Sequence, residues 1–113
     1  MSLIRKIPKQ AKRSTLWRSR KHCTHIRQHA CVKCDTSAGI EVAHVRRGSG
    51  AGMGQKPHDY LAVALCSQCH QRQHETGEDT FWKGHNLQAI IEAFQYTSPC
   101  RREIEQHKRE QSA

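Results

Sequence analysis

The 113-residue sequence lacks any long hydrophobic run and is poor in apolar residues overall. Hydrophobic residues make up 35% of the chain, and the mean hydropathy is −0.85. No segment approaches the roughly 18 apolar residues of a membrane span, and the basic N-terminus lacks the apolar region of a secretion signal. We therefore expect a cytoplasmic protein with one domain at most. Such a thin core usually needs disulfides, a metal or oligomerisation to stay folded.

Acidic residues are missing from the first part of the chain. The first is Asp35, whereas residues 1–21 carry eight lysines and arginines, and the formal net charge is +9. A basic arm of this kind commonly contacts nucleic-acid phosphate, so we expect Lys12 and Arg13 to bind DNA. The alternative is a solvated tail that aids solubility. We expect residues 1–14 to be a disordered arm and residues 15–113 to form a single domain.

Four of the six cysteines form two Cys-x-x-Cys pairs. These are Cys31 with Cys34, and Cys66 with Cys69. In a reducing compartment such pairs bind metal more often than they form disulfides, and four thiolates complete a tetrahedral zinc site. The alternative is a set of small buried residues with free thiols. Cys23 can replace one ligand, whereas Cys100 has no partner at motif spacing.

Three histidines lie where they can carry chemistry. His70 and His74 follow the second cysteine pair, and their spacing of four residues lets both imidazoles of one helix reach one ion. The alternative for each is a surface helix residue. His44 lies at the end of a short apolar segment, where a neutral imidazole can take a proton from water. The alternative for His44 is an ordinary half-buried strand histidine.

The hydrophobic pattern predicts a small α+β domain. Expected helices cover residues 17–29, 67–76, 87–96 and 99–108, and expected strands cover residues 41–45 and 60–65. Asn86 and Ser98 are expected helix caps, and Gly77 is expected to end a helix and lead into an irregular turn. No internal repeat is present.

A glycine-rich segment connects the two expected strands. Residues 48–54 contain four glycines but lack the Gly-Lys-Ser/Thr ending of a phosphate-binding loop, so we interpret them as a long hairpin connection. Arg46, Arg47 and Lys56 flank this loop. They can hold a nucleic-acid backbone, or they can simply be solvated.

Residues 31–77 resemble the HNH endonucleases, the His-Me finger or ββα-metal superfamily. The resemblance lies in a histidine, a glycine loop, a polar middle residue, Leu-Cys-x-x-Cys-His and a final histidine, in that order. The stretches HIRQHACVKC and GMGQKPHDYLAVALCSQCHQRQHETG are similar in particular to small HNH proteins of phages and prophages, which include a RecA-dependent nuclease group. The resemblance implies a small zinc-stabilised ββα-metal finger with flanking helices.

The resemblance also implies a role for each matching residue. His44 matches the general base, and Asp59 matches the middle position, usually asparagine, that orients this base. His70 and His74 match the ligands of a catalytic divalent ion, Mg²⁺ or Mn²⁺, and the four paired cysteines match the ligands of a structural zinc.

One position departs from the family pattern. Many members carry histidine or aspartate before the general base as a third metal ligand, whereas this chain has Ala43, which cannot bind a metal. His58 or Asp59 can compensate, or water and phosphate can complete the coordination of the ion.

The resemblance implies a phage- or prophage-encoded hydrolase that cleaves DNA phosphodiester bonds in the bacterial cytoplasm, during recombination, repair or phage DNA processing. DNA is the implied partner, together with a recombinase filament on that DNA. Two other functions stay open. One is a non-catalytic zinc-stabilised nucleic-acid-binding module, which Ala43 favours. The other is a phage protein–protein adaptor whose basic tails meet an acidic partner.

Overall fold

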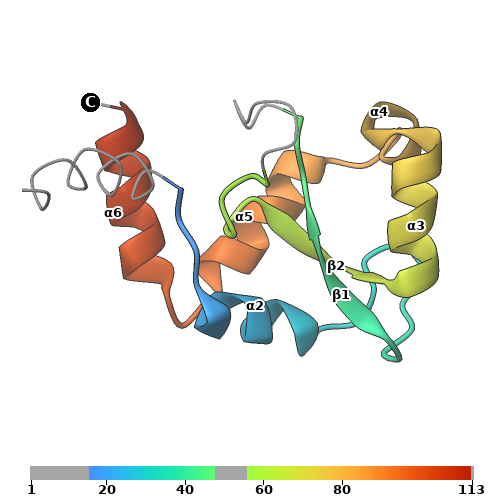
Figure 1. Ribbon diagram of the computed structural model, residues 1–113, viewed down its shortest axis with the longest axis horizontal. Coiled ribbons are helices and arrows are strands. Elements are labelled where there is room, and N and C mark those ends of the chain that lie inside the picture. Colours follow the sequence, from blue (N-terminus) through green and yellow to red (C-terminus); the bar gives the residue numbers. More distant parts are fainter. Residues whose placement is uncertain (1–15, 48–55, 113) are drawn as a thin grey trace, which may run out of the picture.

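The computed structural model describes residues 16–47 and 56–112, which form a two-stranded antiparallel sheet and five helices (Figure 1). In chain order the elements are α2 (Arg20–Arg27), β1 (Ile40–His44), β2 (Ala62–Cys66), α3 (Ser67–Thr76), α4 (Glu78–Phe81), α5 (Leu87–Tyr96) and α6 (Arg101–Ser112). The expected α+β class is confirmed. The basic arm with Lys12 and Arg13, and most of the glycine loop, lie outside these ranges. None of the helices in the described ranges has the length and apolar character needed to cross a bilayer.

The β1–β2 hairpin forms the centre of the fold. Its register runs from Ile40 opposite Cys66 to His44 opposite Ala62. Every residue of β2 is buried, as expected for a short continuous apolar run between packed elements. Helix α5 packs behind β2, α2 packs across β1, and α3 continues directly from β2 at the right of Figure 1.

The core lies between the hairpin, α2, α4 and α5. Its largest fully buried side chains include Trp82, Ile26 and Leu65. The indole Nε1 of Trp82 donates a hydrogen bond of 2.7 Å to Oε1 of buried Gln73. This bond satisfies the one polar atom of the tryptophan side chain and holds the segment after α4 against α3.

Two helices have the bounds expected from the sequence. Helix α3 covers residues 67–76 and ends at Gly77, whose φ of 87° is the left-handed conformation that glycine adopts without strain. Helix α5 covers residues 87–96, and the Asn86 side chain accepts a 3.1 Å hydrogen bond from the amide of Ala89. Local capping chemistry therefore sets both helices.

The expected helix over residues 17–29 is too long at both ends. Helix α2 begins at Arg20 because Ser19 is its N-cap, with Oγ accepting a 3.0 Å bond from the amide of His22. Trp17 is not helical because its carbonyl accepts a 3.0 Å bond from the amide of Asp59. A tertiary contact thus keeps the chain before Ser19 extended.

Other boundaries differ more modestly. The expected strand 41–45 is shifted by one residue, and the expected strand 60–65 starts at Ala62 instead. Leu61 donates its amide to the carbonyl of His58 at 2.9 Å, so a turn precedes β2. The expected final helix 99–108 begins at Arg101 and continues to Ser112.

A short helix replaces the irregular turn expected after Gly77. The carboxylate of Glu78, at the start of α4, accepts the backbone amides of Arg46 and Arg47 at 2.7 and 2.8 Å. This contact ties α4 to the chain that leaves β1, and no short-range pattern in the sequence reveals it.

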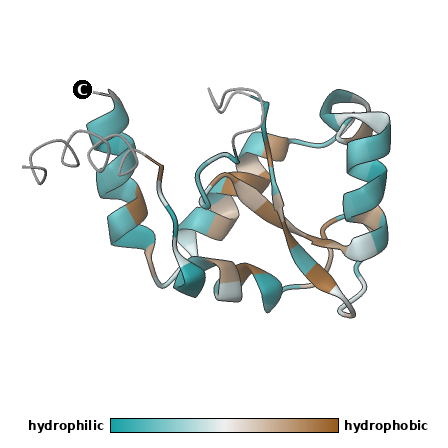
Figure 2. Cartoon of the chain, in the orientation of Figure 1, coloured by the Kyte–Doolittle hydropathy of each residue, from teal (hydrophilic) through white to brown (hydrophobic). Residues whose placement is uncertain are grey.

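Helix α6 attaches to the rest of the fold through a small separate cluster. Ile104 is its buried apolar side chain and packs with Tyr60 and Cys100, whereas most of α6 is hydrophilic (Figure 2). The Tyr60 hydroxyl and His107 Nδ1 are 2.9 Å apart. The helix is thus held by a few side chains at one edge of the domain.

His22 is a buried polar residue at the contact between α2 and the segment before α6. Its Nδ1 lies 2.7 Å from Oγ of Ser98, and its Nε2 has no hydrogen-bond partner within residues 16–47 and 56–112. Burial, with a smaller effect of nearby His25, lowers the pKa of His22 to about 4. The imidazole is therefore neutral in the folded protein at neutral pH.

Acidification is expected to destabilise the domain through His22. The unfolded chain protonates this residue near an ordinary pKa of about 6.5, whereas the folded chain does so only near 4. Stability is therefore lost as pH falls from about 6.5 toward about 4, and the full effect is about 3 kcal/mol. Urea unfolding of wild type and His22→Gln with excess zinc should show a smaller pH slope for the variant. Equal slopes would contradict this assignment.

Candidate metal centre and active-site cavity

The two Cys-x-x-Cys pairs come together where β2 passes into α3. The sulfur atoms of Cys31, Cys34, Cys66 and Cys69 all lie within 4.8 Å of one another. Cys34 Sγ and Cys66 Sγ are 3.7 Å apart, close to the roughly 3.8 Å edge of a tetrahedron with Zn–S bonds of about 2.3 Å. Four soft thiolates in this arrangement fit a structural zinc ion, so these cysteines are positioned to bind a metal.

Backbone hydrogen bonds hold the first knuckle against the hairpin. The amide of Val32 donates to the carbonyl of Ala64 at 3.0 Å, and the amide of Asp35 donates to the carbonyl of Cys31 at 2.9 Å. Asp35 has a φ of 68°, in the left-handed region that aspartate tolerates better than most residues. The turn that presents the first two sulfurs is therefore fixed by β2.

The sulfurs differ in their ease of ionisation before metal binding. Burial disfavours the Cys31 thiolate, but backbone amides of Cys66, Cys34 and Lys33 donate to its sulfur and lower the pKa to about 6. Burial and the neighbouring sulfurs raise the pKa of Cys69 to about 12. Metal must therefore displace a proton from Cys69, and metal affinity falls as the pH is lowered.

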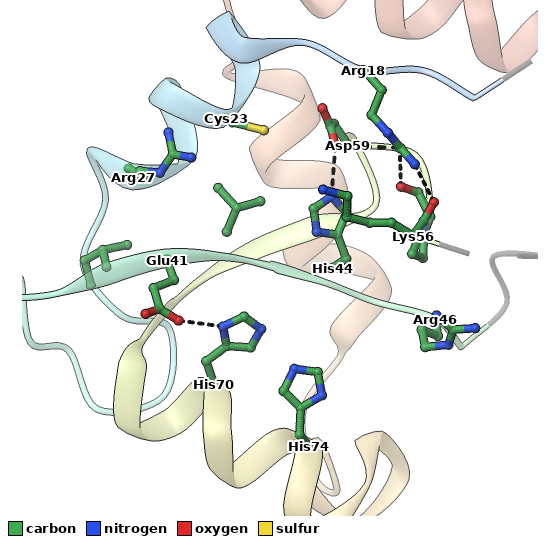
Figure 3. Close-up of a pocket in the computed structure, with 13 residues that line it drawn as sticks. Arg18, Cys23, Arg27, Glu41, His44, Arg46, Lys56, Asp59, His70 and His74 are labelled. Carbon is green, nitrogen blue, oxygen red and sulfur yellow. Dashed lines mark hydrogen bonds and ion pairs between the residues drawn. The ribbon is translucent and has the colours of Figure 1, made fainter. Parts of the chain in front are cut away.

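An open cavity of about 680 Å³ lies beside the hairpin, between α2 and α3. His44 from β1, Asp59 from the segment before β2, and His70 and His74 from α3 all line it (Figure 3). The sequence separates these four residues by up to 30 positions, and the hairpin brings them to one cavity.

Asp59 and His44 form a hydrogen-bonded pair in this cavity. Asp59 Oδ1 lies 2.9 Å from His44 Nε2, and Asp59 Oδ2 accepts a 2.8 Å bond from the amide of Ser19. Burial opposes ionisation of Asp59, but these bonds and nearby Arg18 hold its pKa below the ordinary value. An ionised carboxylate only accepts, so a neutral His44 ring carries its proton on Nε2 and keeps a lone pair on Nδ1.

His70 and His74 present adjacent rings on one face of α3. Their ring centroids are 4.9 Å apart, as expected for residues one helical turn apart. Cys66 starts this helix, because its Sγ accepts the amide of Cys69. Cys66 therefore fixes the start of α3 and, with it, the positions of His70 and His74.

Glu41 is a cavity residue that the sequence reasoning missed. Its Oε1 lies 2.8 Å from His70 Nδ1. Residues two apart on a strand share a face, so Glu41 lies on the same face of β1 as Ala43. That periodicity gives the face of Glu41, but its contact with His70 depends on how α3 packs against β1.

Four cations line the cavity. Arg46 and Lys56 were expected near nucleic acid, whereas Arg18 and Arg27 were not. Arg18 donates to the backbone carbonyls of Lys56 and Pro57 at 2.7 and 2.6 Å, so it also fixes the loop that carries Asp59. No short-range pattern singles out Arg27 among the many basic residues of its segment.

The expected residue Arg47 and the alternative metal ligand His58 do not line this cavity, and neither does Ala43. Arg47 instead pairs with Asp79 at 3.0 Å. Nδ1 of His58 accepts a 3.1 Å hydrogen bond from the amide of Trp17, and its ring stacks on Tyr60. The ring therefore packs beside the cluster that attaches α6. Ala43 is fully buried in the core.

The remaining two cysteines stand apart from the metal centre. Cys23 lines the cavity, where burial and the nearby Asp59 carboxylate raise its pKa. Cys100 is buried beside Ser19, with its Sγ 3.4 Å from the Ser19 hydroxyl. Neither belongs to the four-sulfur group.

The fold and these sites define a small α+β protein in which four cysteines positioned to bind a metal lie beside a basic, histidine-lined cavity. The chain belongs to the family described as Protein of unknown function (DUF968), whose model matches residues 3–97. No curated protein and no solved structure matches the chain. The family description names no activity, so the function is argued from the geometry.

Replacing Cys66 with serine should remove the metal and destabilise the domain. The variant loses one of four ligands, whereas the serine hydroxyl can still cap α3. We expect bound zinc to fall from about one ion per chain to near zero, measured by elemental analysis after purification. Thermal unfolding should shift to lower temperature.

Cys100→Ser is the matched control, since Cys100 is buried but lies outside the four-sulfur group. It should retain its zinc. A Cys66→Ser protein that keeps both zinc and wild-type stability would contradict the metal centre.

Proposed function

We propose that this protein is a metal-dependent DNA endonuclease of the HNH type. The observation that carries the proposal is the pairing of Asp59 with His44 at 2.9 Å in a cavity that His70 and His74 also line. An oriented imidazole, two further imidazoles suited to a divalent ion, and surrounding cations are the groups that phosphodiester hydrolysis requires.

The order of the elements supports this assignment. A histidine on the first strand, an acidic residue before the second strand, and two histidines on the helix that follows it match the strand–strand–helix arrangement of the ββα-metal superfamily. The four-cysteine cluster lies at the junction of β2 and α3, where many members of that superfamily hold structural zinc.

The donor groups on α3 fit a divalent ion in part. Imidazole binds several divalent ions, and Mg²⁺ usually keeps several waters and also binds substrate phosphate. Two histidines would therefore hold Mg²⁺ or Mn²⁺ only with water and phosphate oxygens as the other ligands. When bound, such an ion would stabilise the negative charge that develops on phosphate and on the leaving oxygen.

His44 is the proposed general base. Asp59 accepts the Nε2 proton, so Nδ1 can take a proton from a water molecule as its oxygen attacks phosphorus. The bond from phosphorus to the 3′ oxygen breaks, and solvent protonates that oxygen. The products carry 5′-phosphate and 3′-hydroxyl ends. Asp59 stays ionised and stabilises the imidazolium that forms.

The cations of the cavity are the proposed contacts for the DNA backbone. In the view of Figure 3, Arg27 on α2 and Arg46 just after β1 lie at opposite sides of the cavity, with His44 between them. Lysine and arginine contacts of this kind bind phosphate without reading sequence. The proposed setting is the cytoplasm of a phage-infected or lysogenic bacterium, on free DNA or on DNA coated by a recombinase.

A non-catalytic nucleic-acid-binding module is the second candidate. Ala43 is fully buried and offers no metal ligand. Within residues 16–47 and 56–112, the four cysteines are the one group of three or more donors whose ligand atoms lie within 4.8 Å of one another. This module would keep the zinc and the basic cavity and leave DNA intact.

His44→Ala should abolish cleavage while preserving the fold. Wild type should nick supercoiled plasmid or single-stranded DNA with Mg²⁺ or Mn²⁺ and not with EDTA. Loss of the base should lower the rate by at least about 100-fold, measured by gel quantification, with zinc content unchanged.

His85→Ala is the matched control, because His85 is exposed in the segment between α4 and α5. It should cleave as wild type does. Cleavage retained by His44→Ala would overturn the assignment of the base. Salt-sensitive DNA binding by wild type without cleavage of either substrate would favour the binding module.

Arg27→Ala should weaken DNA binding and its salt dependence. Each phosphate contact contributes roughly one unit to the slope of log affinity against log salt concentration. We expect this slope to become shallower by about one unit, measured by fluorescence anisotropy over a salt series. Arg109→Ala, an exposed residue of α6, is the control. Equal slopes for the two variants would mean that Arg27 does not contact DNA phosphate.

A further inference from the structure

The sequence did not predict the contact between Glu41 and His70. Glu41 Oε1 and His70 Nδ1 are 2.8 Å apart, across 29 positions of sequence. The Glu41 side chain is half exposed and that of His70 is 21% exposed, so the pair stands at the rim of the cavity and is accessible to a ligand.

This contact decides which nitrogen of His70 can bind an ion. A carboxylate can only accept a hydrogen bond, so His70 donates from Nδ1 when its ring is neutral. The lone pair then lies on Nε2. Figure 3 shows Glu41 on one side of the His70 ring and His74 on the other, so the arrangement leaves the His74 side for an ion.

We propose that Glu41 is a positioning residue for a divalent ion held by His70 and His74. Its carboxylate fixes the Nδ1–H tautomer and the ring orientation of His70, so that Nε2 binds the ion. Metal-binding histidines almost always donate their other ring N–H to a carboxylate, a carbonyl or water. This inference rests on the proposed function, because it concerns the ion of that site.

Glu41 and Ala43 are neighbours on one face of β1, but Glu41 does not replace the ligand that Ala43 lacks. On a strand, residues two apart share a face. Ala43 is buried, while Glu41, two residues earlier on that face, reaches α3. The carboxylate therefore contacts the metal-binding helix from a neighbouring position.

Direct coordination by Glu41 fits the geometry less well. The donor atoms of Glu41, His70 and His74 do not all lie within 4.8 Å of one another, in contrast to the four cysteines. A carboxylate that already accepts the Nδ1 proton of His70 supports the ion from the far side of that ring.

The test combines the tautomer of His70 with Mn²⁺ affinity, using zinc-loaded full-length protein. Nitrogen-15 NMR above neutral pH, before Mn²⁺ is added, should show His70 protonated on Nδ1. Glu41→Gln keeps a side-chain oxygen that can accept this proton, so the tautomer should persist and Mn²⁺ affinity should fall less than about 10-fold. Glu41→Ala should shift the neutral His70 ring toward the Nε2–H tautomer and weaken Mn²⁺ binding by about 10- to 100-fold.

Glu92→Ala is the matched control, an exposed glutamate on α5 that lies outside the cavity. It should leave both readouts at wild-type values. Two results would overturn the inference. One is a Glu41→Ala protein with wild-type tautomer and affinity. The other is a Glu41→Gln protein that keeps the tautomer but loses as much affinity as Glu41→Ala, which would make Glu41 a direct ligand.

The experiment also separates this inference from the function on which it rests. If wild type binds Mn²⁺ and cleaves DNA, but Glu41→Ala changes neither the tautomer nor the affinity, only the role of Glu41 is wrong. If wild type binds no Mn²⁺ and cleaves no DNA, the metal-dependent function fails, and the inference fails with it.

Discussion

The convergence of four cysteine sulfurs at the junction of β2 and α3 is the constraint on which the cavity depends. Cys66 ends β2, contributes one sulfur and caps α3. The next turn of that helix carries His70, directly after Cys69. In a chain with so few apolar residues, a metal bound by these sulfurs would supply stability that a larger core would otherwise provide. The same local geometry then places a cavity residue beside the metal centre, so the stability of the fold and the shape of the cavity have one origin.

Asp59 provides a second connection between structure and chemistry. One carboxylate oxygen bonds His44 and the other accepts the amide of Ser19 just before α2. The orientation of the imidazole is therefore coupled to the position of α2, which also contributes Arg27 to the cavity. Because Asp59 is nearly buried, at 7% side-chain exposure, water competes little for these bonds.

Two carboxylate–imidazole pairs stand in a protein whose formal net charge is +9. Glu41 with His70 and Asp59 with His44 have separations of 2.8 and 2.9 Å. Each carboxylate fixes one ring nitrogen as a donor and leaves the other nitrogen available. The surrounding arginines and lysine keep the cavity attractive to phosphate. Basic residues outside the cavity can have other roles, as Arg47 does in pairing with Asp79.

The sequence by itself determined the features that rest on local chemistry. The cysteine spacing identified the four sulfurs that come together, and Asn86 and Gly77 fixed helix boundaries because capping depends on a few neighbouring residues. The tertiary structure decided the rest. Helix α2 starts at Arg20 because Asp59 binds the segment before it. Glu41 reaches His70 only because α3 packs against the hairpin, and Arg18 and Arg27 join the cavity only because α2 and the segment before it pack there. Such contacts join residues far apart in sequence, and no periodicity or spacing within one segment encodes them.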